Sequence, residues 1–245
     1  MIGIKKDHFM VRYAKLALPF DVKAMQTELL AAGKEWHPHI NTYHYSGLWT
    51  VLALRSPGGD HENIMPELMG KHNEYRDNIN MAHFPSVKKL LLNINCPVMA
   101  ARFLNLQAGA VIKEHTDNEL AFEKGEARLH FPVITNPEVE FYCEDERIFL
   151  LEGECWYLNA NLPHRVTNNR DKDRIHLVID CKVNDWLKER INSSGKIAFK
   201  NEEMDENTMV SMIESLRNHH TETSDKLANE LEQRLKETKE KSPVI

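Results

Sequence analysis

The chain has 245 residues, 42% of them hydrophobic and 28% charged, which is ordinary for a globular protein with one sizeable core. Its formal net charge of −6 argues against a protein that follows nucleic-acid phosphates, and its longest apolar runs, such as Leu90 to Leu92, are too short to span a bilayer. The first residues do not resemble a secretion signal, so we expect a cytoplasmic protein that binds neither membranes nor nucleic acid.

The first part of the chain mixes helical and strand patterns. A helical pattern covers Val22 to Ala32, and a strand pattern from Trp49 to Leu54 stops at a Ser-Pro-Gly-Gly turn. Between them lie three histidines with no cysteine or carboxylate cluster nearby, which favours structural or surface residues over a second metal site. These histidines are His37, His39 and His44.

The same segment could also close the mouth of a barrel, as N-terminal segments often do. On that interpretation Asn41, His44 and Trp49 are candidates for substrate binding. Arg102, in the strand pattern before the metal motif, is a further candidate, for a substrate carboxylate. A salt bridge on the barrel surface is an equally good interpretation of Arg102.

The middle of the chain, from Cys96 to Asp180, consists of short strand patterns separated by turn residues. Many short strands at this spacing predict a double-sheet jelly roll or barrel with flanking helices. The predicted strands are Met99 to Leu106, Arg128 to Ile134, Val139 to Cys143, Arg147 to Leu151, Glu154 to Leu158 and Arg174 to Asp180.

The four cysteines are far apart and include no Cys-x-x-Cys pair. This spacing matches neither a disulfide framework nor a zinc knuckle, so we expect small buried side chains in a reducing cytoplasm. The cysteines are Cys96, Cys143, Cys155 and Cys181.

His115 and Asp117 are two residues apart, so they can bind one metal ion from a single strand end. His164, in a proline-containing turn that follows a predicted strand, is the best-placed third ligand. Two imidazoles and one carboxylate are the set with which non-haem Fe(II) oxygenases hold iron while leaving positions open. The His-x-Asp pair alone is a weak signal in a chain with thirteen histidines, and the downstream residues strengthen it. Asn168, four residues after His164, is predicted to hold the turn that aims this imidazole.

Two predicted strands carry basic residues on one face and apolar residues on the other. Arg174 shares a face with His176, and Arg128 shares a face with His130. If both strands face one cavity, they could bind a dicarboxylate such as 2-oxoglutarate, because a guanidinium offers a bidentate fork for a carboxylate. Surface ion pairing is the competing interpretation of each arginine.

After Asp180 the pattern becomes helical, and we expect a jelly-roll domain over residues 1–185 and a helical extension over residues 186–245. In the extension, leucines recur at four-residue steps among alternating Glu and Lys, which predicts a docking helix or, as the alternative, a weak homodimer surface. These leucines are Leu227, Leu231 and Leu235.

The combination of these motifs resembles the aspartyl/asparaginyl β-hydroxylase family over about residues 49–180. The matching stretches are Gly109-x5-His115-Thr116-Asp117, Arg128-Leu129-His130-x-Pro132-Val133-Ile134-Thr135-Asn136, Gly153-Glu154-x3-Leu158-Asn159, His164-x-Val166-x-Asn168 and Arg174-x3-Val178-x-Asp180.

This resemblance implies a double-stranded β-helix with Fe(II) at one mouth. It implies that His115 and His164 are metal ligands, that Arg174 binds the distal carboxylate of 2-oxoglutarate, and that Arg128 and His130 contact co-substrate or substrate. The peptide-modifying members of the family lack the middle carboxylate. This chain keeps Asp117 and is in that respect similar to bacterial proline 3-hydroxylase, which also has a helical C-terminal extension.

We therefore expect an Fe(II)- and 2-oxoglutarate-dependent dioxygenase. Such an enzyme uses O2 to hydroxylate a C–H bond of an amino-acid-like small molecule or a peptide side chain, with succinate and CO2 as co-products. The first alternative is a cupin-like metal-binding or sensor protein without 2-oxoglutarate turnover. The second is a scaffold protein that uses the C-terminal helix.

Overall fold

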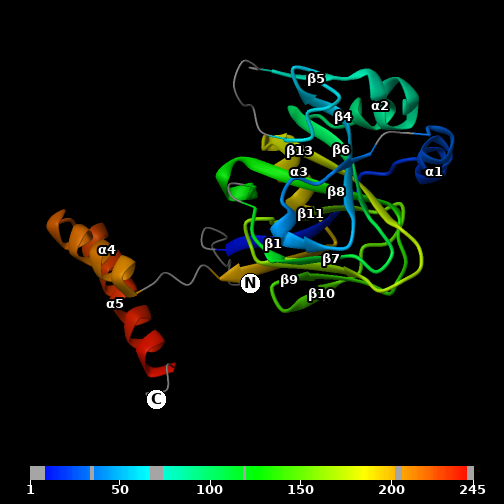
Figure 1. The fold of residues 1–245 in the computed structure, drawn as a ribbon. Coiled ribbons are helices and arrows are strands. Elements are labelled where there is room, and N and C mark those ends of the chain that lie inside the picture. Colours follow the sequence, from blue (N-terminus) through cyan, green and yellow to red (C-terminus); the bar gives the residue numbers. More distant parts are fainter. Residues whose placement is uncertain (1–8, 34–35, 67–73, 118–119, 202–205, 242–245) are drawn as a thin grey trace. The chain divides into compact units, whose positions relative to one another are not determined.

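The computed structural model describes residues 9–33, 36–66, 74–117, 120–201 and 206–241, and the chain divides into two compact units. The larger unit spans residues 10–200 and holds two antiparallel β-sheets. The smaller unit combines residues 1–9 with residues 201–245 and holds the two C-terminal helices (Figure 1). Within the described residues, no helix is both long and apolar enough to cross a membrane.

The larger sheet has the strand order β14-β1-β11-β8-β13-β6-β4-β2, and β5 pairs with β4. Its strands are β1 (Phe9–Leu16), β2 (His37–Pro38), β4 (Trp49–Pro57), β5 (Tyr75–Asp77), β6 (Val98–Leu106), β8 (Glu126–Ile134), β11 (Cys155–Leu158), β13 (Arg174–Lys182) and β14 (Lys196–Asn201).

The smaller sheet has the order β10-β9-β12-β7-β3 and packs against the inner face of the larger one. Its strands are β3 (Tyr45–Ser46), β7 (Val111–His115), β9 (Val139–Cys143), β10 (Glu146–Ile148) and β12 (His164–Asn168). Apolar side chains of both sheets, such as Leu104 of β6 and Phe141 of β9, form one buried cluster between them. The two sheets therefore enclose an interior, as the predicted jelly roll requires.

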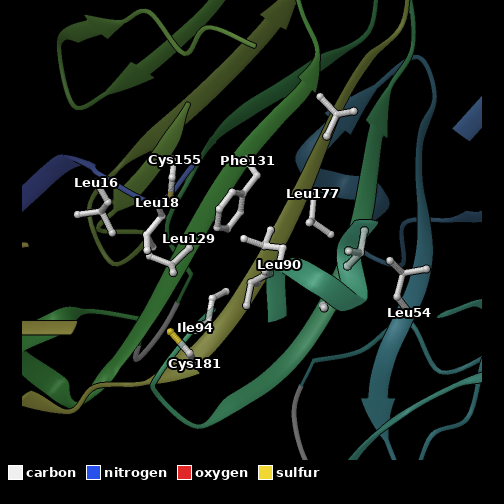
Figure 2. Close-up of a cluster of buried hydrophobic side chains, with 14 of the residues drawn as sticks. Leu16, Leu18, Leu54, Leu90, Ile94, Leu129, Phe131, Cys155, Leu177 and Cys181 are labelled. Carbon is white, nitrogen blue, oxygen red and sulfur yellow. The ribbon is translucent and has the colours of Figure 1, made fainter. Parts of the chain in front are cut away.

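A second apolar core covers the outer face of the larger sheet and includes buried side chains from three helices. Figure 2 shows part of this core. The helices are α1 (Val22–Ala31), α2 (Pro85–Leu91) and α3 (Asp185–Asn192), and short 3-10 turns lie at η1 (Thr42–His44), η2 (Ile79–His83) and η3 (Phe122–Lys124). Leu129 and Phe131 of β8 and Leu177 of β13 belong to this outer core. Because side chains alternate along a strand, their neighbours Arg128, His130 and His176 face the interior.

The predicted fold class is confirmed: the chain is mainly β, a jelly roll with flanking helices and a helical C-terminal part. One local prediction is wrong, because His164 begins strand β12 instead of lying in a turn. The sequence pattern also does not predict β7. In that strand Ile112 is the one fully buried residue, so the alternation of apolar and polar residues is weak.

The two units divide after Lys200, whereas the sequence predicts a division after residue 185. Leu187 and Ile191 of α3 are buried in the outer core, and β14 pairs with β1. The segment from residue 186 to residue 200 thus packs with the jelly roll.

The smaller unit is a helical hairpin of α4 (Glu206–Asn218) and α5 (Glu222–Lys241). Met209 of α4 and Ala228 of α5 are buried, and Arg217 of α4 forms a 3.0 Å ion pair with Glu232 of α5. The predicted leucine stripe is only partly covered within the hairpin, since Leu227 is exposed while Leu231 is half-buried.

Candidate metal centre and ligand cavity

His115, Asp117 and His164 lie together at one end of the jelly-roll interior. β7 and β12 pair antiparallel, which places His164 opposite His115. One potential ligand atom from each of the three residues lies within 4.8 Å of the other two, and Nε2 of His115 is 3.6 Å from Oδ1 of Asp117. The structure thus brings together three predicted ligands that span fifty positions of the sequence.

Both histidines are held in one tautomer by backbone carbonyls. Nδ1 of His115 lies 2.8 Å from the carbonyl oxygen of Lys113, and Nδ1 of His164 lies 3.0 Å from that of Leu162. A carbonyl oxygen can only accept, so each Nδ1 carries the proton and each Nε2 offers a lone pair. Burial, and then the nearby His115, lower the pKa of His164 to about 4, which keeps it in the neutral form that binds metal.

Asp117 completes the site as an ionised carboxylate. Its backbone N–H donates to the carbonyl of Ala160 at 2.8 Å, which fixes the loop after β7, and its side chain accepts from Nη1 of Arg128. Burial alone would raise the pKa of Asp117, but the positive charge of Arg128, with smaller contributions from His164 and His115, outweighs burial and lowers it. Two imidazoles and one carboxylate on a single face fit Fe(II).

Behind this site, Asp180 of β13 binds two arginines. Its carboxylate accepts from Nε of Arg128 at 2.8 Å and from Nη1 of Arg102 at 2.9 Å. Asp180 is almost fully buried, and the two positive charges overcome the effect of burial and lower its pKa. Arg128, predicted to contact co-substrate or substrate, therefore connects Asp180 to Asp117.

The opposite, inner end of the interior carries Arg174 and His176 of β13, with His130 of β8 between this end and the metal triad. The centroid of the His130 ring is 5.9 Å from that of His176. Burial, followed by the charges of neighbours that include Arg174 and His164, lowers the pKa of His130. Arg174 is 2% exposed, and burial lowers its pKa to about 9. Its Nη2 lies 2.9 Å from Nδ1 of His176, and among the described residues no carboxylate pairs with it.

Three buried polar atoms at this inner end have no hydrogen-bond partner among the described residues: Nε of Arg174, Nε2 of His176 and Nδ1 of His130. A buried polar group without a partner is costly, so such a cluster fits a polar ligand. The guanidinium N–H of Arg174 suits a carboxylate group, as expected for one end of 2-oxoglutarate.

A larger cavity of about 630 Å³ opens beside the triad. It is lined by His115 and Asp117 and by all four predicted substrate-binding residues, Arg102, Asn41, His44 and Trp49. His39, which the sequence analysis interprets as a structural or surface residue, also lines this cavity. Its ring stacks on Trp49 with centroids 3.6 Å apart, and burial, followed by the charge of Arg102, lowers its pKa to about 4. His37 and His39 are two residues apart, so on a strand they share one face, and this spacing is the sequence feature that could have predicted a role for His39.

Asn168 does not hold the turn before His164. It is fully buried in β12, and its amide donates to the backbone carbonyls of Leu106, Gln107 and Lys172. These bonds fix the turn that leads into Arg174. The carbonyl of Leu162 holds the His164 ring instead.

Comparison with known sequences gives a family match. The model of the aspartyl/asparaginyl beta-hydroxylase family matches residues 20–183. A curated relative, L-proline cis-4-hydroxylase from Rhizobium meliloti (strain 1021), is 27% identical over 140 residues, which cover 56% of this chain and 49% of the relative. The chain thus spans about half the length of that relative.

Solved structures that match part of this chain include a prolyl-4-hydroxylase from Pseudomonas putida, with a TM-score of 0.42 and 12% identity over 73% of this chain and 94% of the other. An oxidoreductase of the 2OG-Fe(II) oxygenase family from Burkholderia pseudomallei has a TM-score of 0.42 and 12% identity over 64% of this chain and 77% of the other.

Proposed function

The chain belongs to the aspartyl/asparaginyl β-hydroxylase family, and from that premise we propose that it is an Fe(II)- and 2-oxoglutarate-dependent dioxygenase. It hydroxylates a C–H bond of an amino-acid-like small molecule or a peptide side chain. The observation that carries this proposal is the buried Arg174, which lacks a described carboxylate partner and shares one interior with the His115–Asp117–His164 triad.

The residues at the two ends of this interior have separate tasks. Nε2 of His115, Nε2 of His164 and the Asp117 carboxylate would hold the iron, and Arg174 would hold the distal carboxylate of the co-substrate. When bound, iron and 2-oxoglutarate supply the oxidation: O2 oxidatively decarboxylates 2-oxoglutarate to succinate and CO2, and one oxygen atom enters the substrate C–H bond.

The chain's own contribution is orientation and charge. Arg128 holds Asp117 on one side and Asp180 on the other, so the carboxylate ligand stays ionised and aimed at the triad. His130, kept neutral by burial and by Arg174 and Arg128, adds no competing positive charge between the ends. With Asp117 present, no ligand position is freed for chloride, which favours hydroxylation over halogenation.

The proposed substrate site is the cavity of about 630 Å³ beside the metal triad, at the end of the interior that we call the mouth. Arg102 uses Nη1 to bind Asp180 and lines this cavity, where it can bind the carboxylate of an amino acid. Trp49, stacked with His39, forms an apolar wall. The similarity to a proline hydroxylase supports a free amino acid as the substrate class.

We also propose that the protein works in the cytoplasm. Its four cysteines are buried and free, which suits a reducing compartment.

The decisive experiment is anaerobic titration of the Fe(II)-loaded protein with 2-oxoglutarate, followed by exposure to air. We expect a visible charge-transfer band on titration and succinate after air is admitted. A cupin-like metal protein without 2-oxoglutarate turnover would show neither. The absence of both signals contradicts the proposal, and a screen of amino acids for faster succinate release would identify the substrate class.

A further inference from the structure

His176 lies beside Arg174 at the inner end and has no task in the function proposed above. It is 1% exposed and faces the interior from β13. Its Nδ1 lies 2.9 Å from Nη2 of Arg174. A guanidinium can only donate, so Nδ1 accepts, and a neutral imidazole in this state carries its proton on Nε2. Arg174 therefore fixes His176 as a donor through Nε2.

That donor is unused. Nε2 of His176 is fully buried and has no partner among the described residues, and the same holds for Nε of Arg174. Native proteins rarely leave a buried donor unpaired, and here two adjacent donors share the condition. Both donors would be satisfied by one acceptor that accepts from Nε of Arg174 and from Nε2 of His176 at once.

The space at this end selects a small acceptor. Arg174 and His176 line a cavity of about 10 Å³, together with apolar side chains such as those of Val139, Phe141 and Leu150. Space of this size holds about one water molecule, so it admits a small polar group and excludes a bulky one. The guanidinium favours an anion over a neutral acceptor.

We propose that His176 is a second binding residue for the distal carboxylate of 2-oxoglutarate, to which it donates Nε2–H while Arg174 binds the same group. The inference rests on the proposed function. Arg174 and His176 then act as a pair: the arginine sets the tautomer of the histidine, and the histidine orients the arginine. Their combined donors recognise a carboxylate at the end of the co-substrate chain.

Two substitutions separate direct donation from the support of Arg174. His176→Asn keeps an amide near the position of Nδ1, which can still accept from Arg174, but it has no atom at the position of Nε2. His176→Gln places an amide N–H near the position of Nε2. If His176 donates directly, the Gln variant still binds 2-oxoglutarate tightly and the Asn variant binds it more weakly. If His176 only orients Arg174, the order reverses.

The measurement compares two ligands by anaerobic titration of each Fe(II)-loaded variant. One ligand is 2-oxoglutarate, and the other is 2-oxopentanoate, which has a methyl group where 2-oxoglutarate has its distal carboxylate. We expect His176→Asn to weaken 2-oxoglutarate binding about tenfold to a hundredfold, the range for a hydrogen bond to a charged group, and to leave 2-oxopentanoate binding unchanged. His176→Gln should stay within about threefold of the wild type, because it keeps the donor to the charged group.

Equal weakening of both ligands in the Asn variant, or weaker binding of 2-oxoglutarate by Gln than by Asn, would overturn the inference. In either case the wild-type band would still support the proposed function. A wild-type protein that gives no band with 2-oxoglutarate overturns both. Iron affinity and the melting temperature of each variant are measured in parallel, so that misfolding is recognised as a fall in both.

Discussion

The two ends of the jelly-roll interior are both rich in buried charge, but they satisfy it differently. At the mouth, Asp180 binds Arg102 and Arg128, and Arg128 also binds Asp117. At the inner end, Arg174 contacts the neutral His176, and Nε of Arg174 has no partner among the described residues. Charges of opposite sign balance each other at the mouth, whereas positive charge remains unbalanced at the inner end.

This difference separates structural charge from ligand-binding charge. A charge that the chain itself neutralises can hold the fold in the absence of any ligand, while an unpaired buried charge is costly until an anion arrives. We therefore expect the mouth to dominate the stability of the ligand-free protein and the inner end to dominate co-substrate recognition.

The largest expected effect comes from Asp180→Asn, which removes the shared partner of two buried arginines. Removing one member of a buried ion pair typically costs about 3–5 kcal/mol, so the free energy of unfolding in urea should fall by that order. The control is Glu138→Gln, which breaks a surface pair with Arg170 where both side chains are 50% exposed and should cost at most about 1 kcal/mol. Similar losses of stability in the two variants would contradict the conclusion that Asp180 stabilises the fold by neutralising two buried arginines.

Acid should affect the inner end before it affects the Asp180 network. Burial first, and then Arg174, lower the pKa of His130 and of His176 well below the ordinary value of about 6.5. Below about pH 6.5 these two histidines bind protons in the unfolded chain but stay neutral in the folded protein. The free energy of unfolding therefore falls as the pH falls. The loss is up to about 1.4 kcal/mol per pH unit for each of the two residues.

His39 and His164, whose pKa values burial also lowers, add to this loss in the metal-free protein. Asp180 has a lowered pKa, so its contribution is present above about pH 4 and is lost only in stronger acid. Urea unfolding between pH 7.5 and pH 5 measures the loss that the histidines cause while Asp180 is still ionised, and His176→Gln should reduce the slope. Stability that stays flat over this range would refute the prediction.

Metal binding should stabilise the mouth. An ion that binds only the folded state adds about 2.7 kcal/mol when its concentration is a hundred times its Kd. For a protein of this size we expect Tm to rise by about 5–10 °C on addition of Fe(II) without oxygen, and to fall again with a chelator. His115→Ala should remove the rise. A rise that persists in this variant would show that the ion binds elsewhere.

The smallest expected effect is on co-substrate affinity in Arg174→Lys. Lysine keeps the positive charge but lacks the planar fork, so 2-oxoglutarate should bind about tenfold more weakly. Fe(II) affinity should remain nearly unchanged, because Arg174 lies at the other end of the interior from the triad. Anaerobic titrations with each ligand measure both constants. Equal 2-oxoglutarate affinity in the two proteins would exclude Arg174 from this role.

Much of the fold and of the site could be predicted because each depended on local spacing. Strands β6, β8, β9 and β13 show clear alternation, and this alternation also places Arg174 and His130 on the inward face. β7 and β12 carry polar residues such as Lys113 and Arg165, so their pattern is weak although their pairing brings the triad together.

The sequence by itself predicted the residues that we propose carry the chemistry: His115 and Asp117 from their spacing, the later His164, and the arginine ten positions beyond it. Only the tertiary structure decided how these residues are held. The carbonyls that set both tautomers, the sharing of Asp180 by two arginines, and the pairing of His176 with Arg174 all depend on strand register and backbone geometry. Hydrogen bonds require a distance and a direction, and residue order alone contains neither.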